Sequence, residues 1–196
     1  SHNNIMRIYA TILLLVSIKI IGQTKYYALT KVKVDSINFS SQTIFSQFEC
    51  SENFLKQNTG DSSATIANFK AGYDSLHLYV EFFVIDSTLE VNHTKHDSPI
   101  FKNDDCVEIF IDFDGDGKNY LELGVNSNGV YYDCLIICPA IKCGSWKSDL
   151  NFDLDTVLIT SNKTKYTNKL KNLSQNLAYA IQITIPFKSL EAFKKY

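Results

Sequence analysis

The chain has 196 residues, about one to one and a half domains of sequence. Its 19 Lys and Arg residues nearly balance 21 Asp and Glu residues, so the net charge is −2 and the isoelectric point is about 6.1. This balance removes the positive field on which nucleic-acid binding depends. Hydrophobic residues make up 45% of the chain, with only 8 Gly and 3 Pro, which excludes a disordered or fibrous protein.

The N-terminal segment predicts a secretory signal peptide. It has a basic start at Met6-Arg7, an almost wholly apolar run over residues 8–18, and a small residue, Gly22, for cleavage. The apolar run is shorter than the ~20 residues of a membrane-spanning helix. We therefore expect residues 1–22 to be a signal peptide with a short upstream tail and residues 30–196 to form the domain. The mature protein is then expected to be secreted and free of the membrane. The alternative to a signal peptide is that this segment forms a buried N-terminal strand.

The chain contains an odd number of cysteines: Cys50, Cys106, Cys134, Cys138 and Cys143. Export permits disulfides, and an odd count leaves at least one thiol outside any pair within the chain. The spacing of the last three fits no standard zinc motif, and no fourth ligand is evident. We expect one local disulfide or buried thiols.

After the leader, short alternating apolar runs predict strands at residues 76–84, 106–112, 120–125, 130–137 and 177–185. The predicted buried positions of the first two are Leu76, Leu78, Val80 and Phe82, and Val107, Ile109 and Ile111. Asn128-Gly129 predicts a hairpin turn, the polar residues 162–176 a surface loop, and residues 189–195 a short helical turn capped by Ser189. Many short strands with regularly spaced turns favour an all-β fold, an antiparallel β-sandwich of jelly-roll or immunoglobulin-like type.

Three aspartates, Asp112, Asp114 and Asp116, alternate around a glycine turn. Such carboxylates can converge their oxygens on one hard cation, and without a cation they repel one another. The loop is not an EF-hand, because its twelfth position is Leu123 and the flanking segments are strands. The pattern predicts a structural Ca²⁺ site; an acidic, solvated turn is the alternative.

Aromatic residues gather beside the acidic segments at Phe101, Tyr120, Tyr131, Tyr132 and Trp146. Flat rings next to polar groups suit a sugar site, because the C–H face of a pyranose stacks on a ring while its hydroxyls need fixed partners. The alternative is that such rings fill the sandwich core. Paired carboxylates around Glu108 would suit glycosidic acid–base chemistry, but no nucleophile motif accompanies them, so catalysis is not favoured.

Residues 97–133 carry an ordered set of motifs that resembles carbohydrate-binding module family 9. The motifs are Asp97-Ser98-Pro99-Ile100-Phe101, then Asp104-Asp105-Cys106-Val107-Glu108-Ile109-Phe110-Ile111-Asp112-Phe113-Asp114-Gly115-Asp116-Gly117-Lys118-Asn119-Tyr120, then Leu121-Glu122-Leu123-Gly124-Val125-Asn126. Segments 73–80 and 180–190 look like further landmarks of that family, so the resemblance covers roughly residues 35–196.

The resemblance implies a β-sandwich that binds plant-type polysaccharides, of the xylan or glucan kind, or their chain ends. It also implies a domain that is not catalytic, binds calcium structurally and works with a glycoside hydrolase in carbohydrate catabolism. Members of the family continue for several dozen residues beyond the position of Tyr196, so we expect the C-terminal strands to be missing.

Residue by residue, the resemblance places Phe101 where the family often has an aromatic that faces the sugar. Glu108 matches a polar contact, and Tyr132 matches a common Trp. Together with the pattern of aromatics and acids, this predicts a carbohydrate site. Phe101, Tyr132 and Trp146 are expected to stack on sugar rings, and Asp104, Glu108, Glu122 and Asn126 to bond hydroxyls or brace the site.

Two departures from the family pattern are His96, which replaces a frequent Arg, and Gly124, which stands where relatives carry a polar side chain. Two other functions therefore stay open. One is a haem-type redox sandwich, which would have to rely on histidines such as His77 or His93, because the sole methionine, Met6, lies in the leader. The other is a secreted interaction or adhesion module without a sugar site.

Overall fold

The computed structural model describes residues 29–31, 44–54, 65–86, 88–112, 119–137, 147–149, 152–154, 156–166 and 176–191. Its strands are β1 (Thr30–Lys31), β2 (Ile66–Tyr73), β3 (His77–Asp86), β4 (Cys106–Ile111), β5 (Tyr120–Asn126), β6 (Tyr131–Ile137), β7 (Lys147–Asp149), β8 (Leu158–Tyr166) and β9 (Asn176–Pro186). The two short helices are α2 (Ile100–Asn103) and α3 (Phe187–Leu190).

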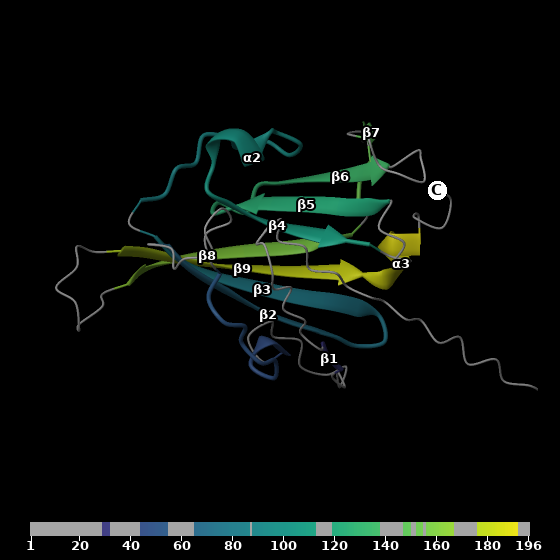
Figure 1. Ribbon diagram of the computed structural model, residues 1–196, viewed down its shortest axis with the longest axis horizontal. Coiled ribbons are helices and arrows are strands. Elements are labelled where there is room, and N and C mark those ends of the chain that lie inside the picture. The colour runs from purple at the N-terminus through teal and green to yellow at the C-terminus, as the bar shows by residue number, and fades with distance from the viewer. Residues whose placement is uncertain are drawn as a thin grey trace, which may run out of the picture.

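The strands form two sheets that pack against each other (Figure 1). The five-stranded sheet has the order β1-β2-β3-β9-β8, and the four-stranded sheet has the order β4-β5-β6-β7. Every pair is antiparallel except β1 with β2, which is parallel. The predicted all-β sandwich is confirmed.

The core lies between the sheets, because alternate side chains of each strand point inward. Val107, Ile109 and Ile111 of β4 are buried there, as predicted. Leu76 was predicted to join the core and does not: it precedes β3 and is 63% exposed. The carboxylate of Asp74 accepts hydrogen bonds from the backbone N–H groups of Leu76 (2.6 Å) and His77 (2.7 Å), so Leu76 belongs to the turn that starts the strand.

The predicted hairpin between β5 and β6 is confirmed. Gly129 has a φ of +81°, a conformation that glycine adopts without steric cost. The side-chain oxygen of Asn126 accepts hydrogen bonds from the backbone N–H groups of Asn128 and Val130, both at 3.0 Å. One asparagine therefore closes the turn.

Two predictions near the C-terminal end of the chain are wrong. Residues 162–166 are strand rather than loop, since β8 pairs with β9 as far as Tyr166. This edge strand is mostly polar, and none of its residues 158–163 is buried, so it lacks the apolar alternation that reveals an inner strand. Ser189 lies inside α3 and does not cap it; the residue at the cap position is Pro186.

Several predicted features fall outside the described residues, namely residues 1–22, Asp114, Asp116, Cys138, Cys143, Trp146 and 167–175. The signal peptide and the limits of the domain therefore stay predictions. Cys50, Cys106 and Cys134 are described and form no disulfide with one another. Among the described helices, none has the length and apolar character needed to cross a membrane.

Part of the outer face of the five-stranded sheet is covered by a hydrophobic cluster made of Ile44, Phe45, Phe48 and Tyr79. The ring of Phe48 lies directly over Gly72 of β2, where a Cβ atom would overlap three of its ring atoms. Glycine is therefore required at this position for the segment before β2 to dock on the sheet.

We expect Gly72→Ala to lower the free energy of unfolding by about 1–3 kcal/mol, because the added methyl group must displace the Phe48 ring. Urea unfolding measures this cost. In a Phe48→Ala background the same change should cost much less, since the space above Gly72 is then empty. Equal costs in the two backgrounds would show that the ring does not impose the glycine.

Candidate functional site

The predicted site residues meet on the outer face of the four-stranded sheet. The register places Glu108 of β4 opposite Gly124 of β5, and Gly124 opposite Tyr132 of β6. Because side chains alternate along each strand, this row points away from the core that Val107 and Ile109 help to form. The face thus carries one carboxylate, one gap and one aromatic ring in line.

Tyr132 fills the gap above Gly124. A Cβ atom at Gly124 would overlap the tyrosine ring, so only glycine lets the ring lie across β5. The hydroxyl thereby lies 2.7 Å from Oε1 of Glu122 and 3.0 Å from Oε1 of Glu108. At position 124 the resemblance leads us to expect a polar side chain. The glycine found there leaves that space to the Tyr132 ring.

Phe101 lies over Tyr132 and is the exposed aromatic of this face. The two ring centroids are 5.4 Å apart in an edge-to-face arrangement. Tyr132 is only 5% exposed, whereas Phe101 is 50% exposed. Phe101 is held by α2, whose Ile100 is fully buried. Phe101 can therefore stack on a ligand, while Tyr132 supports it from below.

One proton is shared in this group. A phenol has a single proton, so the Tyr132 hydroxyl can donate fully to only one carboxylate. Burial, together with the charge of Glu122, raises the pKa of Glu108, although the hydrogen bond with Tyr132 opposes this shift. Burial and the two carboxylates raise the pKa of Tyr132 as well, so its hydroxyl keeps its proton. Glu108 is thus the carboxylate that is short of donors.

The side chains of Asp104 and Asn126 are buried, and their polar atoms bond within the fold. The buried Asp104 carboxylate accepts hydrogen bonds from the His93 imidazole Nδ1 (2.8 Å), the Asn126 amide (2.8 Å) and the backbone N–H of Asn92 (3.0 Å). Burial alone would raise its pKa, but these bonds hold the pKa of Asp104 at about 2. Both residues brace the loop before α2, which is one of the two roles predicted for them.

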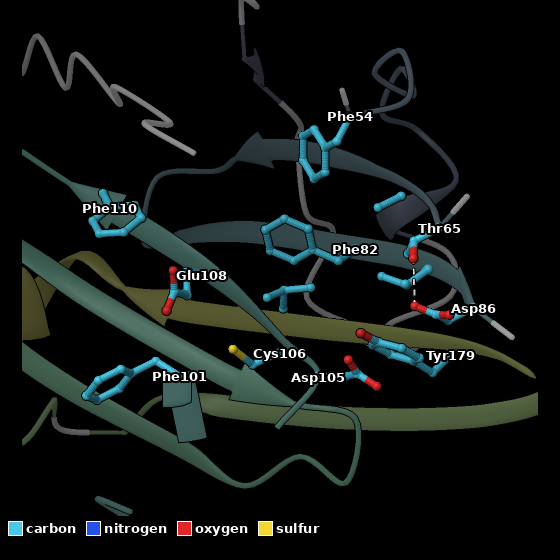
Figure 2. Close-up of a pocket in the computed structure, with 13 residues that line it drawn as sticks. Phe54, Thr65, Phe82, Asp86, Phe101, Asp105, Cys106, Glu108, Phe110 and Tyr179 are labelled. Atoms are coloured by element: carbon cyan, nitrogen blue, oxygen red, sulfur yellow. Dashed lines mark hydrogen bonds between the residues drawn. The ribbon is translucent and has the colours of Figure 1, made fainter. Parts of the chain in front are cut away.

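A cavity of about 400 Å³ opens beside Glu108, between the edge strand β4 and the other sheet (Figure 2). Figure 2 shows Phe101, Glu108 and Phe110 on the side of β4 and Phe54 and Phe82 on the opposite side. This volume falls within the range of about 300–1,000 Å³ typical of small-ligand sites. The cavity therefore continues the outer face over the edge of the sheet.

Sequence reasoning did not find two of the cavity walls. For Phe110 a signal was present. It lies two residues after Glu108, so strand alternation alone would have placed it on the same face. Phe54 carries no such signal, because its segment docks on β2 through a hydrogen bond from the Phe54 N–H to the Ala67 carbonyl (2.7 Å). That contact depends on the tertiary structure.

For metals, the structure describes only part of the predicted calcium loop: Asp112 is buried, and the other two aspartates are outside the described residues. Elsewhere in the described chain, His96, Asp133 and Asp153 could hold an ion, since one ligand atom from each lies within 4.8 Å of the others. The His96 imidazole Nε2 lies 3.2 Å from the buried Asp133 carboxylate.

Comparison with known protein families gives a match to part of the chain. Residues 37–133 match the family model described as "Carbohydrate family 9 binding domain-like". The resemblance to carbohydrate-binding module family 9 is confirmed. The matched residues include Phe101, Glu108, Gly124 and Tyr132, and the match supports a carbohydrate-binding role.

Two solved structures are similar to the chain. One, a candidate carbohydrate-binding protein from Bacteroides uniformis ATCC 8492, has a TM-score of 0.61 at 12% identity and covers 82% of this chain and 72% of its own. It shares the fold. The other, a family 9 carbohydrate-binding module from Caldicellulosiruptor kristjanssonii in complex with cellotriose, has a TM-score of 0.46 at 19% identity and covers 80% of this chain and 66% of its own. No curated protein matches the chain significantly.

The raised pKa of Glu108 predicts a pH-dependent stability. The folded state binds the Glu108 proton more tightly than the unfolded state, so stability contributed by the protonated form is present at low pH and is lost as pH rises through the raised pKa. Glu108→Gln stays neutral, and its amide can donate to the Tyr132 hydroxyl. We expect its advantage over the wild type in melting temperature to grow between about pH 4 and about pH 7.

Thermal unfolding across this pH range measures the effect. Glu90→Gln, the same change at an exposed glutamate, controls for the loss of a charge. Parallel pH profiles for Glu108→Gln and the wild type would contradict the assignment.

Proposed function

We propose that this domain binds a polysaccharide or oligosaccharide on the outer face of its four-stranded sheet and in the adjoining cavity. The observation that carries the proposal is Phe101, a half-exposed ring beside the Glu108 carboxylate at the mouth of a cavity of about 400 Å³. Such a ring can stack on the C–H face of a sugar, and the carboxylate can accept hydrogen bonds from its hydroxyls. The family match supports this assignment.

Binding without catalysis fits the carboxylates of the site. A glycoside hydrolase needs two carboxylates that flank the scissile bond from opposite sides. Here Glu108 and Glu122 lie on one sheet face and contact the same Tyr132 hydroxyl.

The finer parts of the function are proposals as well. A ligand of the xylan or glucan type, a partnership with a glycoside hydrolase in carbohydrate catabolism, and secretion all follow from the sequence resemblance and the N-terminal pattern. Trp146 is proposed as a further stacking residue, and Asp112, Asp114 and Asp116 as ligands of a structural Ca²⁺ ion.

Phe101→Ala tests the sugar site directly. We expect it to weaken binding of xylo- or cello-oligosaccharides at least about tenfold, or about 1.4 kcal/mol, because it removes the exposed stacking surface. The melting temperature should change little, since the ring is half-exposed. Isothermal titration calorimetry and thermal unfolding measure the two effects.

Leu158→Ala is the matched control for this variant. Leu158 is a large hydrophobic residue, 63% exposed, on β8 of the other sheet. Its truncation should leave the affinity unchanged. If Phe101→Ala binds the oligosaccharides as well as the wild type does, Phe101 has no place in the site.

Calcium binding at the acidic loop predicts that added Ca²⁺ raises the melting temperature of the wild type and that chelator reverses this. The double variant Asp114→Asn/Asp116→Asn should lose the response, because it removes two of the three ligand carboxylates. His96→Ala should keep the response, which separates this loop from the group that contains Asp133. If the double variant still responds to calcium, the ion binds elsewhere and the proposed site is wrong.

A further inference from the structure

The cavity beside Phe101 is aromatic and acidic at once. Its rings include Phe54, Phe82 and Tyr179, and its carboxylates are Asp86, Asp105 and Glu108. Among the described residues that line it, none is Lys, Arg or His. Carboxylates beside aromatic faces form an environment that attracts a cation, through both charge and the π-system of the rings.

The protein supplies two of these carboxylates, Asp105 and Glu108, with neutral donors. Oδ2 of Asp105 accepts a hydrogen bond from the backbone N–H of Glu90 at 2.7 Å. Oε1 of Glu108 lies 3.0 Å from the Tyr132 hydroxyl, whose single proton is shared with Glu122. No described lysine, arginine or histidine forms an ion pair with Asp105 or Glu108. Each can therefore accept from a charged ligand.

The ring of Phe101 already accepts a cation. The Lys102 ammonium lies over this ring, 5.7 Å from its centroid. Lys102 extends from α2 and does not line the cavity. One ring of the cavity wall thus already pairs with an ammonium group, which belongs to the protein itself.

We propose that the cavity takes an amino sugar, so that the ligand is a glycan with free ammonium groups, such as an oligomer of β-1,4-linked glucosamine. This inference rests on the proposed function and changes its ligand from a neutral glycan of the xylan or glucan type to a cationic one. An ammonium-bearing pyranose offers a C–H face to the rings and a positive charge to Asp105 and Glu108. A neutral sugar offers the carboxylates hydroxyl donors but no charge, and an anionic sugar is repelled by the carboxylates.

The test compares three oligosaccharides of equal length: glucosamine, N-acetylglucosamine and glucose oligomers, all β-1,4-linked. They share one backbone and differ only in the substituent at C2. In calorimetric titrations at low ionic strength, we expect the glucosamine oligomer to bind at least about tenfold more tightly than the other two. Added salt should reduce this preference, because screening weakens attraction between charges.

Two variants assign the preference to the cavity. Asp105→Asn keeps an oxygen acceptor for the Glu90 N–H and removes the charge, and Glu108→Gln removes the second charge. Each should lower the ratio of glucosamine to glucose affinity. Asp153→Asn, which removes an exposed carboxylate outside the cavity lining, should leave the ratio as it is in the wild type.

Equal affinities for the glucosamine and glucose oligomers would overturn this inference and leave the proposed function standing. A preference for N-acetylglucosamine, or a glucosamine preference that is unchanged in both cavity variants, would overturn it as well. If the folded protein binds none of the three oligomers, nor xylo-oligosaccharides, the proposed function itself fails.

Discussion

The outer face of the four-stranded sheet depends on one side chain, Tyr132, lying across the neighbouring strand. Its ring needs the space above Gly124, and from there its hydroxyl reaches carboxylates on two strands, Glu108 and Glu122. Phe101 packs edge-to-face on the same ring. The direction of Phe101 and the hydrogen bonding of Glu108 are therefore set together, and a change at Gly124 would disturb both.

A glycine covered by an aromatic ring also occurs on the other sheet, where the ring is buried. Gly72 accepts the ring of Phe48 as Gly124 accepts the ring of Tyr132. Phe48, however, is enclosed by Phe45 and Tyr79 in a buried cluster. Tyr132 is covered by the half-exposed Phe101. One outer face is thus closed by packing, and the other leaves an aromatic ring in contact with solvent.

The sequence predicted those parts of the fold that depend on neighbouring residues, namely the alternation along a strand and a tight turn. Alternation placed Ile109 in the core and Glu108 outside, and an Asn-Gly pair predicted the β5–β6 turn. The edge strand β8 was missed because its polar residues show no alternation. The wall at Phe54 was missed because only the packing of its segment on β2 brings it to the cavity. The sequence therefore predicted which side chains of a strand point into the core, and it missed the part of the cavity wall that tertiary packing supplies.

The acidic residues before and within β4 show why a run of carboxylates does not define a site. Asp104 and Glu108 lie four residues apart, yet their pKa values shift in opposite directions. Asp104 is surrounded by donors from His93 and Asn126, so its hydrogen-bonding capacity is used within the fold. Glu108 faces one shared hydroxyl proton and an open cavity. The group that can serve a ligand is the one whose acceptors the fold leaves incompletely satisfied, and only the count of donors in the folded structure separates it from its neighbour.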